Sequence, residues 1–135
     1  MQTPRCGHVV LACMDFRFQQ PLRRFLAAEG LEGDADLLSW PGGAACLTID
    51  GEAERALEAL ALARRLHGCD RAVLVTHEDC MRLGGSAAHA DPQAEVEALT
   101  GYLRDAAGRL RASVPELEVR LVRLTLAGDA IEVDD

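Results

Sequence analysis

Two short segments of the chain carry residue types that can hold a metal ion. Cys13 directly follows the apolar run at residues 8–12, and His77 and Cys80 follow the apolar run at residues 72–76. Two thiolates and one imidazole form a zinc ligand set, and three protein ligands leave the fourth corner of a tetrahedron open, as in catalytic zinc sites. Each cysteine could instead be a small, buried apolar residue that binds no metal. The joint occurrence of the two segments favours a catalytic zinc site.

Composition limits the partners of this 135-residue chain. Its formal net charge of -8 opposes binding to the phosphate backbone, so we expect no nucleic-acid partner. The basic residues are all arginine, which excludes a lysine Schiff base. The five cysteines are scattered and do not suggest a secreted disulfide framework. No apolar run reaches the roughly 18–20 residues of a membrane span and no signal-peptide pattern opens the chain, so we expect a cytoplasmic protein without a membrane partner.

Short apolar runs and helical spacing predict the order of the elements. The runs at residues 8–12, 36–40 and 72–76 are typical of parallel strands buried on both faces. Three helices are expected: residues 21–29, ending at Gly30; a helix through residues 53–63, with Asp50 as a candidate N-cap; and a helix that opens at Asp91 and Pro92. A strand near residues 118–126 and a short run at 130–133 predict a terminal hairpin.

This alternation of strands and helices predicts one α/β domain over residues 1–135, a three-layer α/β/α sandwich. Its sheet should contain about four parallel strands and an antiparallel C-terminal edge strand. If the second and third strands flank the first, the first and third end side by side at a topological switch point, where open α/β sheets bind ligands. Cys13 and His77 then lie at one edge, and Cys80 can fold back onto the same ion.

The other histidines and cysteines have simpler interpretations. The segment at residues 81–90 has no periodicity and is either a mobile lid or an ordinary surface connection. His89 within it is a conceivable proton shuttle, although a solvated loop histidine is the favoured interpretation. Cys6 is interpreted as a small apolar residue, and His67 as a helix-terminal residue. Neither is assigned a function.

The pattern Cys-x-Asp-x-Arg followed by His-x-x-Cys resembles the β-class carbonic anhydrases. The predicted strand order, the Gly-rich turn after the second strand and the terminal hairpin are also similar, so the resemblance covers nearly the whole chain. It implies that Cys13, His77 and Cys80 bind Zn²⁺ and that Asp15 and Arg17 form the catalytic dyad.

The resemblance implies reversible hydration of carbon dioxide to bicarbonate by a zinc-bound hydroxide, and a homodimer. Asp15 would accept a hydrogen bond from the zinc-bound water, and Arg17 would hold Asp15 ionised through a bidentate pair. If that pair broke, the Asp15 carboxylate could close the site by taking the fourth metal position. The alternative for this pair is a local turn with a surface ion pair worth ~0–1 kcal/mol.

Several positions differ from the family's common pattern. The family commonly has Arg-Asn-Ala-Gly after its second strand, whereas this chain has Trp-Pro-Gly-Gly-Ala at residues 40–44. Phe16 stands where the family often has Ser, and Met81 where it usually has Gly. We expect Phe16, Gly42, Gly43 and Met81 to line the substrate pocket.

These differences leave two alternatives open. The apolar Phe16 and Met81 would suit a related zinc hydrolase of carbon disulfide or carbonyl sulfide. The lost polar pair would also suit a non-catalytic member of the fold that keeps zinc structurally or binds a protein partner. Comparing turnover of the sulfur compounds with turnover of carbon dioxide separates the first alternative from a carbonic anhydrase. Hydration that is abolished by Asp15→Ala would eliminate the second.

Overall fold

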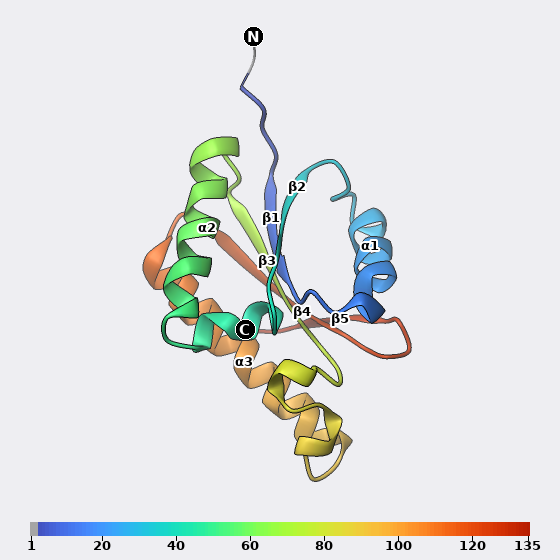
Figure 1. Cartoon of the computed structure of the whole chain (residues 1–135). Coiled ribbons are helices and arrows are strands. Elements are labelled where there is room, and N and C mark those ends of the chain that lie inside the picture. The colour runs from blue at the N-terminus through green and yellow to red at the C-terminus, as the bar shows by residue number, and fades with distance from the viewer. Residues whose placement is uncertain (1–2) are drawn as a thin grey trace.

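The structure is a computed structural model that describes residues 3–135. Its strands and longer helices are β1 (His8–Ala12), α1 (Gln19–Ala28), β2 (Ala35–Ser39), α2 (Glu52–His67), β3 (Arg71–His77), α3 (Pro92–Ser113), β4 (Glu118–Leu124) and β5 (Ala130–Val133). Short 3-10 helices lie in the connections: η1 (Phe16–Phe18), η2 (Gly43–Thr48), η3 (Met81–Leu83) and η4 (Ser86–Ala88). The order of strands and helices confirms the predicted alternation (Figure 1).

The sheet has the order β2-β1-β3-β4-β5. The first four strands are parallel, and β5 pairs antiparallel with β4, as predicted. The chain adds β2 on one side of β1 and β3 on the other, so the order of strand addition reverses at β1. This is the topological switch point of the sheet. The β1–β3 register pairs Leu11 with Leu74. Cys13 is two residues after Leu11 and directly follows β1, and His77 is three residues after Leu74 and ends β3, so both lie at the same edge.

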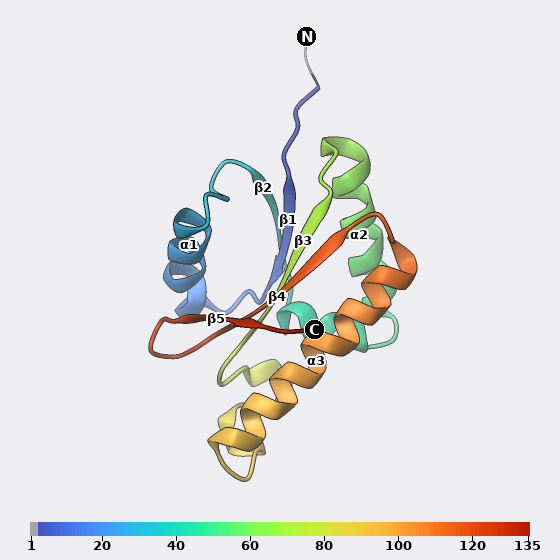
Figure 2. The ribbon, with the colours of Figure 1, turned by 180° about the vertical axis from the view of Figure 1, so that it is seen from behind.

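Helices cover both faces of this sheet, which confirms the three-layer sandwich (Figures 1 and 2). Successive strand residues point to opposite faces, so each buried strand supplies two cores. On one face the strands pack against α1 through a cluster that includes Val10, Val73, Val122, Leu22 and Phe25. On the other face they pack against α2 and α3 through a cluster that includes Leu11, Leu74, Leu121, Leu60, Leu103 and Leu110. Each fully buried leucine stabilises the fold by about 1.5–3 kcal/mol.

The helix termini confirm one predicted cap and correct another. The Asp91 side chain accepts a hydrogen bond from the backbone N–H of Ala94 at 2.8 Å and opens α3, as predicted. The prediction that Asp50 caps α2 was wrong. Gly51 is the N-cap, with a φ of 88°, and its N–H donates to Glu54 Oε2 at 2.6 Å. Glycine readily adopts this positive φ, so the N-cap is Gly51, one residue after Asp50. The Glu54 side chain caps the helix by accepting the hydrogen bond from the Gly51 N–H.

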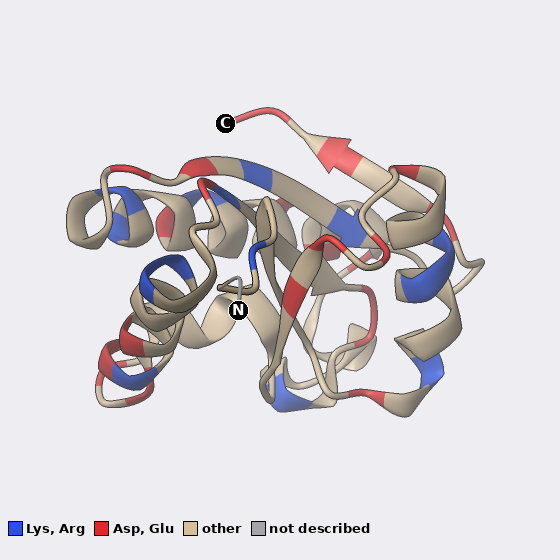
Figure 3. Ribbon diagram, turned by 90° about the horizontal axis from the view of Figure 1, so that it is seen from above, with Lys and Arg blue, Asp and Glu red and all other residues tan. Residues whose placement is uncertain are grey.

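Charge along α2 follows the helix dipole. Glu52 and Glu54 lie in the first turn, and Arg64, Arg65 and His67 lie in the last. Each group therefore faces the end of the helix that carries the opposite partial charge. Figure 3 shows acidic and basic positions interspersed along the helices. Within residues 3–135, no helix combines the length and apolar character needed to cross a membrane.

Gly43 allows the turn after β2 to close over the ends of β1 and β3. Its φ is +57°, in the left-handed region, and a Cβ atom there would lie 2.5 Å from the carbonyl oxygen of Val75 and 2.8 Å from the backbone nitrogen of Cys13. Both neighbours are backbone atoms, which cannot rotate away as a side chain can. Glycine is therefore required at this close approach.

We expect Gly43→Ala to destabilise the protein by about 2–5 kcal/mol, because left-handed strain and overpacking add. Denaturant unfolding measures the loss. Gly101→Ala is the matched control, since a Cβ at this α3 position meets no atom within 4 Å. The control should gain about 0.5–1 kcal/mol. Equal stability of the two variants would contradict the steric argument.

Candidate metal centre and active site

Cys13, His77 and Cys80 converge at the carboxyl edge of the sheet. Their candidate ligand atoms all lie within 4.8 Å of one another. Cys13 follows β1 and is half-buried, whereas His77 at the end of β3 and Cys80 three residues later are buried. The backbone N–H of Gly42 donates to Cys13 Sγ at 3.4 Å. The fold thus brings together the three residues that the sequence nominates as ligands.

The ring of His77 is oriented for metal binding. Its Nδ1 lies 2.7 Å from the carbonyl oxygen of Glu78, which can only accept, so Nδ1 carries the proton and Nε2 keeps its lone pair. Nε2 is buried and has no hydrogen-bond partner among residues 3–135. Phe18 stacks on the ring at a centroid distance of 4.1 Å. A buried lone pair beside two thiols fits a zinc ion, which would satisfy it.

A hydrogen bond between the Cys13 and Cys80 thiols shifts their pKa values in opposite directions. A hydrogen bond from Cys80 lowers the pKa of Cys13 to about 4, although burial acts in the opposite direction. The same hydrogen bond and burial raise the pKa of Cys80. Burial lowers the pKa of His77, but contact with Cys13 and with the Glu78 carbonyl outweighs it and leaves that pKa raised. Zinc binding would release protons from this group, because metal ligands must be deprotonated.

Asp15 and Arg17 form a forked ion pair beside these ligands. Arg17 Nη2 lies 2.7 Å from Asp15 Oδ2, and Arg17 Nε lies 3.1 Å from Asp15 Oδ1. Hydrogen bonding to Arg17 holds the pKa of Asp15 below its usual value, despite partial burial. Asp15 Oδ2 is also 3.8 Å from His77 Nε2. An ionised carboxylate therefore lies next to the candidate metal ligands.

Arg17 also binds Asp79, a residue that the sequence analysis did not single out. Arg17 Nη1 donates to Asp79 Oδ2 at 3.0 Å, and Arg17 Nη2 donates to the Asp79 carbonyl at 2.9 Å. Asp79 lies between His77 and Cys80 and has a φ of 57°. One guanidinium thus joins the ligand-bearing segment after β1 to the one after β3.

The buried side chain of Glu95, on α3, holds the ligand-bearing segment after β3 in place. It is only 5% exposed, and it accepts hydrogen bonds from the Asp79 backbone N–H at 2.9 Å and from Ser86 Oγ at 2.9 Å. The Ser86 N–H donates to Asp79 Oδ1 at 2.7 Å. This hydrogen bond is the largest cause of the lowered pKa of Asp79, and the hydrogen bond from Arg17 is the second. Sequence reasoning missed Glu95. A signal existed, because Glu95 precedes Leu99 by four residues on the buried stripe of α3.

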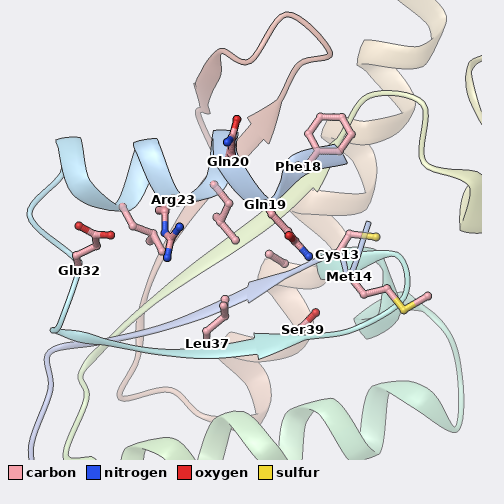
Figure 4. Close-up of a pocket in the computed structure, with 12 residues that line it drawn as sticks. Cys13, Met14, Phe18, Gln19, Gln20, Arg23, Glu32, Leu37 and Ser39 are labelled. Atoms are coloured by element: carbon pink, nitrogen blue, oxygen red, sulfur yellow. The ribbon is translucent and has the colours of Figure 1, made fainter. Parts of the chain in front are cut away.

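A cavity of about 580 Å³ opens beside Cys13, between α1 and the ends of β1 and β2 (Figure 4). Its lining includes Cys13, Met14, Gln19, Leu22, Leu37 and Ser39. The four residues expected to form the substrate pocket lie outside this lining: Phe16, Gly42, Gly43 and Met81. Phe16 is 78% exposed and Met81 70% exposed, each next to a residue of the site. Their part in substrate binding stays a prediction.

Comparison with known proteins identifies the family. A family model described as "Putative carbonic anhydrase" matches residues 3–119. The chain belongs to the carbonic anhydrase family. This membership confirms the resemblance seen in the sequence motifs. Among curated proteins, none matches the chain.

Two solved structures share the fold of this carbonic anhydrase family member. The β-carbonic anhydrase isoform I of the protozoan Trichomonas vaginalis has a TM-score of 0.66 and 13% sequence identity, over 100% of this chain and 86% of that chain. A structure from a study of two tetrameric β-carbonic anhydrases of the filamentous ascomycete Sordaria macrospora has a TM-score of 0.54 and 17% identity, over 100% of this chain and 83% of that one. The fold is therefore that of the β class.

We expect Cys13→Ser and Cys80→Ser each to lose about one zinc ion per chain relative to the wild type, because a thiolate ligand is removed. Elemental analysis of protein purified without added metal or chelator measures this. Cys46→Ala is the control, since Cys46 is buried like Cys80 but is not one of the three candidate ligands. Unchanged zinc in both serine variants would remove these residues from the ligand set.

Proposed function

We propose that this protein is a zinc-dependent carbonate dehydratase, which interconverts carbon dioxide and bicarbonate at an ion held by Cys13, His77 and Cys80. The observation that carries the proposal is the convergence of these three side chains around the unpartnered buried Nε2 of His77, within the part of the chain that the structure describes. Membership of the carbonic anhydrase family supports the same chemistry.

The geometry of the site supports a role for each protein group. A zinc ion at this site would supply Lewis-acid activation of water, which lowers the water pKa from about 15.7 toward about 7. The Asp15 carboxylate accepts a hydrogen bond from the reacting water and orients its lone pair toward the carbon of the substrate. Arg17 keeps Asp15 ionised and fixes its rotamer through two hydrogen bonds. Asp79 and Glu95 position Arg17 in turn.

The substrate approach is proposed to pass Phe16, Gly42, Gly43 and Met81. Carbon dioxide is small and apolar, so exposed apolar side chains next to Asp15 and Cys80 suit it. Gly42 and Gly43 contribute only backbone atoms to the turn after β2. These residues would admit the substrate without adding a charged group.

A second candidate function is hydrolysis of carbon disulfide or carbonyl sulfide by the same residues. The specific observation in its favour is the apolar surface of Phe16 and Met81, which are 78% and 70% exposed. Sulfur analogues are more polarisable than carbon dioxide and gain more from such contacts. Turnover of the three substrates by one zinc-loaded preparation decides between the two functions.

The proposal includes a homodimer in the cytoplasm. Large apolar side chains around the site are exposed in the single chain: Met14, Phe16, Leu37 and Met81. Several exposed large apolar side chains near one site suit a protein–protein contact. A cytoplasmic location suits the five free cysteines, because reduced thiols persist in that compartment.

Light scattering of the purified protein should give about twice the mass of the 14.5 kDa chain. Phe16→Glu should shift the mass toward that of one chain, because it places a charge in the apolar contact. Leu62→Glu, at another exposed apolar position on α2, is the control and should leave the mass unchanged. A wild-type protein of single-chain mass at micromolar concentration would contradict the dimer.

We expect Arg17→Ala to keep its zinc but to lower kcat/KM for carbon dioxide hydration by about 100-fold or more, because Asp15 loses its orientation and its counter-charge. Asp15→Asn should give a similar loss. Stopped-flow hydration assays with parallel zinc analysis measure both effects. Arg55→Ala, a surface position on α2, is the control.

Two outcomes would overturn this assignment. Full activity in Arg17→Ala would show that the Asp15–Arg17 pair is only a local ion pair. A zinc-loaded wild-type protein that hydrates none of the three substrates would favour the non-catalytic alternative.

A further inference from the structure

A second group of metal-binding side chains lies at the opposite, amino edge of the sheet. Candidate ligand atoms of Cys6, Asp36 and His67 all lie within 4.8 Å of one another. Cys6 precedes β1, Asp36 is the second residue of β2, and His67 is the last residue of α2. In Figure 1 the start of β1, the start of β2 and the end of α2 lie together, away from the carboxyl ends of the strands. At about 3.3 Å per extended residue, Cys6 is roughly 20 Å from Cys13.

Hydrogen bonds hold the three residues together. The Cys6 N–H donates to the carbonyl oxygen of His67 at 3.1 Å, which places the thiol beside the end of α2. His67 Nδ1 lies 2.6 Å from Asp36 Oδ2, which links the helix end to β2. Among residues 3–135, Cys6 Sγ donates one weak hydrogen bond, at 3.4 Å, to the carbonyl oxygen of His8. The thiol can leave this contact at little cost.

The setting suits a cation. Cys6, Asp36 and His67 are all half-buried, so an ion can enter from solvent and still lose part of its hydration shell. The C-terminal end of α2 adds the partial negative charge of the helix dipole beside His67, the last residue of the helix. An ion pair between His67 and Asp36 would explain two of the three groups. It would not explain a thiol fixed at the same point.

We propose that Cys6, Asp36 and His67 form a second, structural site for Zn²⁺. Thiolate, imidazole and carboxylate are the three protein ligand types of zinc, and water would complete the tetrahedron. The ion would tie three segments that are far apart in sequence: the chain before β1, the start of β2 and the end of α2. Zinc bound in this way stabilises the folded chain, because the site does not exist in the unfolded one.

The test begins from Cys13→Ser/Cys80→Ser, in which the first site is removed. We expect equilibrium dialysis with Zn²⁺ to find about one ion per chain, and thermal unfolding to show a zinc-dependent rise in Tm. Adding Asp36→Asn or His67→Gln should lower the zinc affinity at least ~10-fold and abolish that rise. Asp34→Asn is the matched control, because Asp34 lies at the same edge but pairs with His8 instead. This control should bind zinc like its parent.

Wild-type protein gives a second measurement that does not depend on the folding of the double variant. With excess Zn²⁺ it should bind about two ions per chain, and Asp36→Asn should bind about one. In Co²⁺-substituted protein, Cys6→Ser should remove part of the thiolate-to-cobalt absorption.

Two results would overturn the second site. One is that the Cys13→Ser/Cys80→Ser variant binds no zinc and the wild type binds only one ion per chain. The other is a Tm loss in Asp36→Asn that is the same with and without Zn²⁺, which would leave only the ion pair. Neither result bears on carbon dioxide hydration, since the two sites are emptied separately. A protein that binds zinc at both sites but lacks hydration would overturn the proposed function alone.

Discussion

The parallel pairing of β1 with β3 decides where the candidate active site lies. Because Leu11 is opposite Leu74, the two strands end at the same edge and deliver Cys13 and His77 to one point. The turn after β2 then closes over both ends, and only a residue without a Cβ fits there, at Gly43. The ligands therefore depend on strand pairing and backbone contact more than on their own local sequence.

Arg17 converts this convergence into an ordered site. Its guanidinium binds Asp15 on one ligand-bearing segment and Asp79 on the other, and Glu95 anchors Asp79 from α3. Lysine could not replace it, because one ammonium group cannot form two forked contacts in fixed directions. Hydrogen bonds from Arg17 also lower the pKa of Asp15, so Asp15 is ionised when the site works. For Asp15, orientation and charge state thus have one cause.

Much of this fold could be predicted from sequence because periodicity and chain connectivity leave few choices. Apolar runs identified the strands, and the two-sided burial of β1 and β3 required helices on both faces. The expectation of two-sided burial was wrong for β2, because it is an edge strand and leaves Leu37 exposed. The N-cap of α2 could not be predicted in the same way. Asp50 has the preferred side chain, but Gly51 takes the positive φ and Glu54 completes the cap. Only the backbone geometry decides which of two such neighbouring residues is the N-cap.

Site residues were predictable where they follow strands and were missed where tertiary packing brings them in. Asp79 and Glu95 are 16 residues apart, and their contact depends on how α3 crosses the sheet edge. Asp36 and His67 are 31 residues apart, and each alone has an ordinary structural interpretation.

The second group nevertheless follows from the rule that located the first. Cys6 and His67 precede the same two strands that Cys13 follows and His77 ends. The pairing that unites the carboxyl ends of β1 and β3 also brings together the segments that enter them. Residues that precede two adjacent parallel strands therefore meet for the same reason as residues that follow them, because one register sets both edges of the sheet.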